Sequence, residues 1–328
     1  MIKQYKFIRI VAFVCLFLFF YIFFKLGPIN ILQIIQKVVW YNFLILFFMR
    51  FFSWLFRAAI WKNILAQYEK PPPLWQLFLA RLSGHAVGYL TPTAKIGGEA
   101  ARTLMVKTAD RKKVFASVIV DKTIELVSIV LLFLIAELVA ILYISMPNSK
   151  KISFIAFTIL ITALSIWLLR KQKKGLLIWF VDLLKKMKIK FTFLEKNRIK
   201  LKETDTYISD FLTTKKGVFV KTLFLYILHT MIWTSEIYFT FLFLKAEGIT
   251  FLVCFLLVIL GSVSFSVPMI PASLGIYEIT YVSLFVLLGI NIQFGLAMIL
   301  VRRILGLIWA GLGMIPILAR RNIQKSET

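Results

Sequence analysis

Seven long apolar runs dominate the sequence. They cover residues 7–24, 38–56, 127–144, 152–169, 219–244, 251–267 and 292–318. Most of them approach or exceed the roughly 20 residues that a helix needs to cross the hydrocarbon core of a bilayer. A mean hydropathy of +0.86 over 328 residues is far above what a water-soluble domain of this length needs. We therefore expect an all-α polytopic membrane protein with about seven or eight transmembrane helices.

Basic residues set the expected orientation of these spans. The chain has 40 Lys and Arg against 15 Asp and Glu, and residues 170–216 hold 14 basic and 5 acidic side chains. Cytoplasmic loops of membrane proteins are enriched in Lys and Arg. We therefore predict a multi-pass protein of the cytoplasmic membrane, with the N-terminus, the basic loop 170–216 and the C-terminus on the cytoplasmic side. We interpret the charge as a membrane signal and expect no nucleic-acid partner.

The basic loop begins with an amphipathic stretch, GLLIWFVDLLKKMK. Its apolar residues recur at helical spacing, and charged residues occupy the opposite face. The apolar positions are Leu176, Leu177, Phe180, Leu183, Leu184 and Met187, and the charged ones are Asp182, Lys185 and Lys186. A helix of this kind lies along the membrane surface and favours anionic lipid headgroups. A topology signal with no further role is the alternative.

Two segments with proline and glycine interrupt the apolar pattern, PTAKIGGE and PASLGIYE. Each places a proline seven residues before a glutamate, with glycine between them. The residues are Pro92, Gly97, Gly98 and Glu99 in the first segment, and Pro271, Gly275 and Glu278 in the second. Proline and glycine break helices, and such backbone is tolerated at membrane depth where protein or a water-filled cavity shields it. We predict a re-entrant or broken helix at both places.

The sequences that follow the two segments are also similar. ASVIVDKTIEL begins at Ala116 and AMILVRRILGL begins at Ala297, and their alignment pairs Lys122 with Arg303. We predict two inverted repeats, about residues 38–144 and 219–318, within a single membrane domain of residues 1–328. Interrupted segments at matching positions of inverted halves point to a binding site near the bilayer midplane. Chance similarity between apolar stretches is the alternative.

Ionisable side chains within membrane spans are costly, so each needs a partner or a function. The predicted substrate-binding residues are Glu99, Arg102, Lys122, Glu278 and Arg303. The candidate proton-coupling residues are Glu278, Asp121, Glu236 and His229. The alternative for these residues is structural, either pairing with one another or polar packing in the core.

Signatures of common enzyme classes are absent from the sequence. It contains no P-loop, HExxH, nucleophile elbow or Rossmann fingerprint. Cys15 and Cys254 lie in apolar runs and lack the spacing of metal ligands. We expect no catalytic residue, metal site or cofactor, and no enzymatic activity. The alternative, a membrane-embedded transferase, is disfavoured because the longest polar segment has 47 residues.

Together these features resemble a known family. GGEAARTLMV after a proline, DK some twenty residues on, and PASLGIYE followed by LVRRILGL are similar to the flippase-like transmembrane domain of lysylphosphatidylglycerol synthases. The resemblance covers almost the whole chain and implies a stand-alone lipid-translocating domain with two re-entrant elements. Lys122 stands where that family usually has Arg, and Lys cannot contact phosphate through two parallel hydrogen bonds.

We therefore expect an integral membrane lipid translocase. Its substrate would be an anionic or modified lipid: a phospholipid, an aminoacyl-phospholipid or a polyprenyl-phosphate-linked lipid. Arg102, Lys122 and Arg303 would receive the anionic headgroup through charge-assisted hydrogen bonds. The alternative is a membrane scaffold or accessory subunit for a separate lipid-modifying or glycosyl transferase. The lipid class and the oligomeric state stay open on the residues alone.

Overall fold

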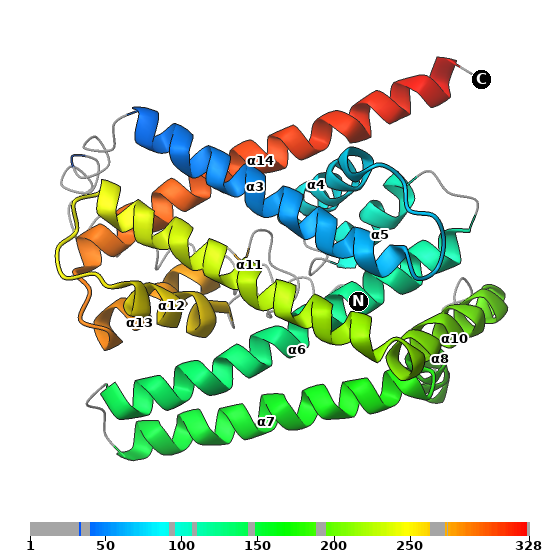
Figure 1. Cartoon of the computed structure of the whole chain (residues 1–328), viewed down its shortest axis with the longest axis horizontal. Coiled ribbons are helices and arrows are strands. Elements are labelled where there is room, and N and C mark those ends of the chain that lie inside the picture. Colours follow the sequence, from blue (N-terminus) through cyan, green and yellow to red (C-terminus); the bar gives the residue numbers. More distant parts are fainter. Residues whose placement is uncertain are drawn as a thin grey trace. The chain divides into compact units, whose positions relative to one another are not determined.

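The computed structural model of the chain consists of helices joined by turns and loops in the residues that it describes, with no strand among them (Figure 1). These are residues 33, 40–91, 96–106, 110–143, 148–187, 195–262, 273 and 275–326. The helices are α3 (Trp40–Leu65), α4 (Leu74–Leu90), α5 (Ile96–Met105), α6 (Arg111–Tyr143), α7 (Asn148–Lys173), α8 (Leu176–Lys186), α10 (Arg198–Thr214), α11 (Lys216–Phe243), α12 (Phe251–Gly261), α13 (Ile276–Leu287) and α14 (Ile292–Ser326).

Five of the described helices are long and apolar enough to cross a membrane. They contain the spans Trp40–Leu65, Arg111–Leu142, Lys151–Lys173, Lys216–Phe243 and Ile292–Ala319. The predicted all-helical, multi-pass class is therefore confirmed. The apolar run 7–24 lies outside the described residues.

Two pairs of short helices interrupt the sequence of long spans. The helices α4 and α5 have 17 and 10 residues, and α12 and α13 have 11 and 12 residues. At about 1.5 Å per residue, none of the four reaches the roughly 30 Å of a hydrocarbon core. The predicted Pro92 and Pro271 lie outside the described residues. The two interruptions thus fall at the two predicted places, and their re-entrant character stays a prediction.

The chain divides into two compact units. Unit 1 comprises residues 1–55, 78–105 and 229–328, and unit 2 comprises residues 56–77 and 106–228. Unit 1 thus holds both pairs of short helices almost entirely, together with α14. This division follows contacts within the chain, and the predicted inverted repeats stay a prediction.

Unit 2 is built around the long helices α6 and α7, which run antiparallel (Figure 1). Thr123 of α6 and Gln172 of α7 are both buried and exchange hydrogen bonds of 3.0 and 2.7 Å. An apolar core joins α3, α6, α10 and α11 through buried residues that include Ile64, Val120 and Phe211.

The predicted amphipathic helix of the basic loop is α8, which spans Leu176–Lys186. It begins after Gly175, whose φ of +96° is strained for any residue with a Cβ. The Asp205 carboxylate of α10 accepts the first helical N–H groups, from Leu177 at 3.0 Å and Ile178 at 2.9 Å. A residue distant in sequence therefore caps this helix.

Unit 1 packs α14 against α3 and α4. Phe47 of α3 stacks on Trp309 of α14, with 4.8 Å between ring centroids. Gly313 of α14 lies against the Leu82 carbonyl and Ala86 of α4, so closely that an added Cβ would overlap them. Small residues allow close backbone approach between membrane helices, where lipid offers no hydrophobic driving force.

Candidate functional site

The first interrupted segment is a tightly packed pair of helices. A Cβ added to Gly84 of α4 would lie 2.6 Å from the carbonyl oxygen of Gly98 in α5. Glycine is therefore required for this backbone contact. Glu99 follows in the first turn of α5 and accepts a hydrogen bond of 3.2 Å from Nη1 of Arg102. Arg102 is 2 % exposed, and Gly97, in the same turn, is half-buried.

The second interrupted segment also places a glycine and a glutamate at the start of a short helix, α13. Gly275 precedes the helix with a φ of +82°, a conformation that favours glycine. Its N–H donates to Oε2 of Glu278 at 2.6 Å, so the carboxylate caps its own helix. Gly261 of α12 approaches the Tyr281 ring of α13, where an added Cβ would lie 2.6 Å from the ring.

Glu278 and Arg303 form a buried ion pair in unit 1. Oε1 of Glu278 accepts from Nε of Arg303 at 2.8 Å and from Nη2 at 2.5 Å. Nη1 of Arg303 donates to the Tyr89 hydroxyl of α4 at 3.4 Å, and the guanidinium carbon lies 4.9 Å from the Tyr277 ring centroid. The structure thus joins α4, α13 and α14 through Arg303.

The neighbouring Arg302 has a different environment. It is 7 % exposed, and its guanidinium lies over the Trp233 ring of α11 at 5.3 Å from the centroid. Its Nη1 has no hydrogen-bond partner within the described part of the chain. Successive residues of a helix point about 100° apart, which directs Arg302 to α11 and Arg303 to α13.

The polar face of α11 is engaged by α3. Nε of Arg50 donates to Oε2 of Glu236 at 3.1 Å, and Nη2 of the same arginine donates to Oε1. The Ser53 hydroxyl hydrogen bonds with Nε2 of His229 at 2.9 Å. His229 and Glu236 thus have separate partners, and their proposed proton-coupling role stays a prediction.

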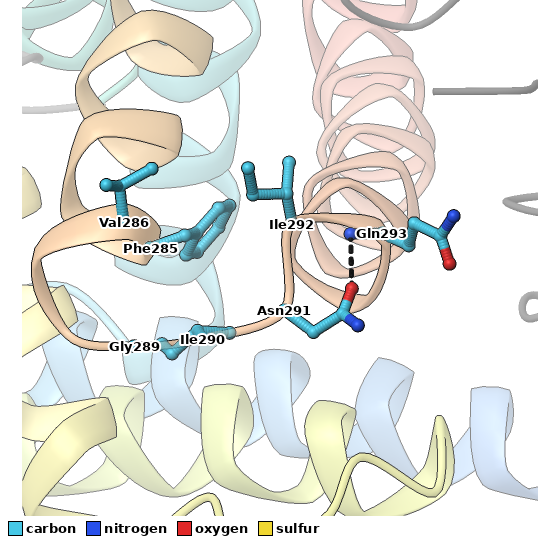
Figure 2. A pocket seen from close by; sticks show the side chains of 7 residues that line it. All are labelled: Phe285, Val286, Gly289, Ile290, Asn291, Ile292 and Gln293. Atoms are coloured by element: carbon cyan, nitrogen blue, oxygen red, sulfur yellow. Dashed lines mark hydrogen bonds between the residues drawn. The ribbon is translucent and has the colours of Figure 1, made fainter. Parts of the chain in front are cut away.

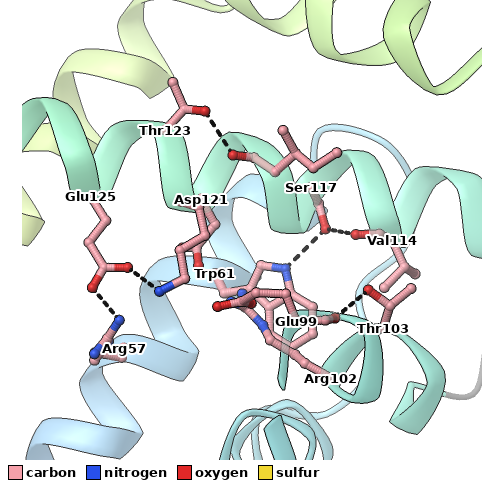
Figure 3. Close-up of polar contacts among 12 residues, drawn as sticks. Arg57, Trp61, Glu99, Arg102, Thr103, Val114, Ser117, Asp121, Thr123 and Glu125 are labelled. Atoms are coloured by element: carbon pink, nitrogen blue, oxygen red, sulfur yellow. Dashed lines mark hydrogen bonds and ion pairs between the residues drawn. The ribbon is translucent and has the colours of Figure 1, made fainter. Parts of the chain in front are cut away.

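Asp121 and Lys122 belong to unit 2. Oδ1 of the fully buried Asp121 accepts from the Tyr226 hydroxyl at 2.5 Å. Nζ of Lys122 donates to Oε2 of Glu125 at 2.7 Å, and Oε1 of Glu125 accepts from Nη2 of Arg57 at 2.5 Å. Figure 3 shows the contact between Glu125 and Arg57.

Another polar link in Figure 3 joins α3 to the start of α6. Nε1 of Trp61 donates to the Ser117 hydroxyl at 3.0 Å, and that hydroxyl donates to the Val114 carbonyl at 2.7 Å. All of these groups are buried, so this link is structural.

A surface pocket of about 590 Å³ lies at the turn between α13 and α14 (Figure 2). Its lining residues are uncharged: Phe285, Val286, Gly289, Ile290, Asn291, Ile292 and Gln293. Oδ1 of Asn291 accepts the Gln293 N–H at 2.9 Å, which caps the start of α14. Arg302 lies ten or so residues further along α14, about 15 Å in axial distance. The pocket therefore does not include Arg302, Arg303 or Glu278.

Several residues around the ion pairs of unit 1 could not be identified as site residues from the sequence. The structure brings Glu99 to Arg102 and Glu278 to Arg303, as the alternative of internal pairing expected. It adds Tyr89, Tyr277, Tyr281 and Arg302. A tyrosine inside an apolar run is indistinguishable in the sequence from a residue of the packed core. Of these four residues, Arg302 alone could have been recognised from the sequence, because it is a charge within a predicted span. Within the described residues no group of three metal-ligating side chains gathers.

The five long apolar helices define a polytopic helical membrane protein. The family described as the lysylphosphatidylglycerol synthase transmembrane region matches residues 7–313. A UPF0104 membrane protein of Pyrococcus horikoshii is 27 % identical over 259 residues, which are 73 % of this chain and 75 % of that protein. The chain belongs to the lysylphosphatidylglycerol synthase transmembrane-region family, a membrane-protein family linked to lipid handling.

Proposed function

We propose that the protein is a lipid translocase for an anionic or modified lipid. One observation carries the proposal: each interrupted segment places a glutamate in the first turn of a short helix, and each glutamate binds an arginine. The pairs are Glu99 with Arg102 and Glu278 with Arg303. Broken helices with charged groups at matching positions are typical of transporters that bind substrate at mid-depth.

The chemistry of these pairs suits an anionic headgroup. A carboxylate that binds a guanidinium occupies the place that a phosphate would take, because both present oxygen acceptors to the same N–H donors. Exchange of carboxylate for phosphate would open the pair when lipid enters and restore it when lipid leaves. The acyl or prenyl tails would remain in the bilayer during this exchange.

The substrate classes proposed are phospholipid, aminoacyl-phospholipid and polyprenyl-phosphate-linked lipid. The family description, which names a lysylphosphatidylglycerol synthase, favours the first two. We propose the cytoplasmic membrane as the location, with the basic loop 170–216 and both termini in the cytoplasm. The proposed activity is transport without chemical change of the lipid, and lipid modification by the purified chain alone would contradict it.

Reconstitution into vesicles with a fluorescent phosphatidylglycerol tests the proposal. Wild-type protein is expected to move the lipid between leaflets, and Glu278→Gln and Arg303→Ala are expected to slow it by about tenfold or more, as loss of a charge-assisted hydrogen bond does. Glu247→Gln is the matched control, because Glu247 is an exposed acid in the turn after α11. Equal rates for all four proteins would remove the proposed site.

The accessory-subunit function has one observation in its favour. The helices α8 and α10 form a folded basic surface, in which Nη1 of Arg198 binds Oδ1 of Asp182 at 2.6 Å. Lys185 and Lys186 are exposed on it. If this surface recruits a transferase, Lys185→Glu with Lys186→Glu should abolish co-purification of that enzyme and leave lipid movement unchanged. Loss of lipid movement in the same variant would count against a separate recruiting role.

A further inference from the structure

We propose that Arg302 is the group that first receives the anion, while Arg303 is still paired with Glu278, and that Tyr281 donates a second hydrogen bond to the anion. The ligand is the phosphate of a lipid headgroup. This inference rests on the proposed function and deepens it, because it assigns separate roles to two adjacent arginines of α14. Arg303 is then a positioning residue, which holds α13 through Glu278.

Arg303 is already engaged by partners within the protein. Its Nε and Nη2 donate to Glu278 and its Nη1 donates to Tyr89. One face of its guanidinium is covered by the Tyr277 ring. Each of the three nitrogens therefore has an internal acceptor. An anion would have to displace a buried carboxylate to reach this residue.

Arg302, by contrast, is buried without a counterion among the described residues. Its side chain is as buried as a core residue, at 7 % exposed, and its Nη1 lacks an acceptor among the described residues. Of the described carboxylates, none lies within ion-pair distance of it, whereas Arg50, Arg102 and Arg303 each have one. Burying a charge without a counterion is expensive, so a missing anion is the simplest account of this position.

The charges around Arg302 are also unbalanced. The titratable groups near enough to interact electrostatically with Arg302 include Tyr277, Tyr281, Glu236 and Tyr89. The acid among them, Glu236, is held by both ends of the Arg50 guanidinium fork. Arg50, Arg302 and Arg303 are three cations against the two anions Glu236 and Glu278, which leaves one positive charge in excess. A singly charged phosphodiester would balance it.

The geometry around Arg302 leaves one edge of its guanidinium available. The Trp233 ring covers one face of the Arg302 guanidinium, so what remains available is the in-plane N–H edge. The Tyr281 hydroxyl is also buried, makes no hydrogen bond of standard geometry in the described structure and lies near the Tyr277 side chain, and its ring is held against Gly261. Two donors without acceptors call for a ligand that only accepts, as phosphate oxygens do.

Binding experiments on the purified, delipidated full-length protein test this assignment. Three probes are compared: dihexanoyl-phosphatidylglycerol, dihexanoylglycerol, which lacks phosphate, and inorganic phosphate. Wild-type protein is expected to bind the phospholipid well above the other two. Arg302→Gln should weaken that binding by about tenfold or more, and Tyr281→Phe by a smaller factor. Arg303→Lys, which keeps a charge opposite Glu278 but lacks the guanidinium fork, should weaken that binding less than Arg302→Gln does.

Arg198→Gln is the charge-matched control, since Arg198 is an exposed arginine of α10 in unit 2. The melting temperature without lipid is a second readout: Arg302→Gln should melt at or above the wild-type temperature, because it removes a buried charge that lacks a counterion. Unchanged phospholipid binding by Arg302→Gln would overturn the assignment. Equal binding of inorganic phosphate and phospholipid would contradict the proposal that the anion belongs to a lipid headgroup.

Lipid movement measured on the same variants separates this inference from the proposed function. If wild type and Arg302→Gln move lipid equally, the Arg302 assignment fails and the translocase stands. If wild type binds phospholipid through Arg302 and moves none, the translocase fails and the anion site stands.

Discussion

Oε1 of Glu278 accepts two hydrogen bonds from Arg303, which lies 25 residues later in the chain, while Oε2 of the same carboxylate accepts the Gly275 N–H. One side chain thus starts α13 and attaches it to α14. The carboxylate is nearly inaccessible to solvent, at 4 % exposed, and Arg303 is 16 % exposed. Breaking a buried pair from one side costs more than removing both partners, because it leaves a charge without compensation.

Glu278→Gln is therefore expected to destabilise the protein by about 3 kcal/mol or more. The double variant Glu278→Gln with Arg303→Met should be more stable than the single variant, since it leaves no buried charge unpaired. Unfolding in mixed micelles, arranged as a double-mutant cycle, measures the coupling. Additive effects of the two substitutions would show that the pair contributes nothing.

Gly98→Ala should separate α4 from α5. The added Cβ would meet the carbonyl oxygen of Gly84, which is backbone and cannot move without shifting the helix. We expect a loss of about 1–3 kcal/mol, as for other overpacked sites. Gly217→Ala is the control, because no atom lies near its Cβ position and alanine favours the helix. Equal stability of the two variants would contradict the close approach.

Asp205→Ala should release the start of α8. Its carboxylate accepts the N–H groups of Leu177 and Ile178, which have no acceptor within their own helix. Hydrogen exchange at these two amides should rise by about tenfold, the equivalent of roughly 1 kcal/mol of capping free energy. Asp205→Asn keeps one acceptor oxygen and should show a smaller increase. Unchanged exchange in both variants would mean that the cap contributes nothing.

The same carboxylate makes stability depend on pH. Burial raises the pKa of Asp205 above its ordinary value of 3.8, and the hydrogen bonds from Leu177 and Ile178 oppose that rise. Between 3.8 and the raised pKa, the folded protein therefore holds more protons at this site than the unfolded chain. The contribution of Asp205 to the free energy of unfolding is then largest below that window and falls as the pH rises through it. Unfolding measured across this range should lose that slope in Asp205→Asn; identical slopes would contradict the raised pKa.

Lys122→Gln separates a substrate role from a structural one. The Lys122 side chain is 38 % exposed, and Glu125 keeps Arg57 as a partner when Lys122 is replaced. Partly exposed pairs contribute little, so stability should change by less than about 1 kcal/mol. A large loss of lipid movement with this small change would support the predicted contact with substrate. Unchanged movement would assign Lys122 to its pair with Glu125 alone.

The helical segments could be predicted from the sequence because each depends on local composition. A run of apolar residues as long as Lys216–Phe243 has one stable arrangement in lipid, where every backbone N–H must bond within its own segment. The spacing of Glu99 and Arg102 likewise allowed their contact as the alternative to a substrate role, because three residues span about one helical turn. The amphipathic pattern of residues 176–187 predicted α8 for the same reason.

What the tertiary structure decided is which of two adjacent charges is neutralised. Arg302 and Arg303 share the same apolar surroundings in the sequence, and nothing local distinguishes them. Their environments differ because α13 brings Glu278 to one and α11 brings Trp233 to the other. Partners so far apart in sequence are set by helix packing, which depends on shape and small-residue contacts along whole helices. Sequence by itself therefore determined which described segments form long apolar helices, whereas packing alone determined which arginine is left with an N–H edge to offer.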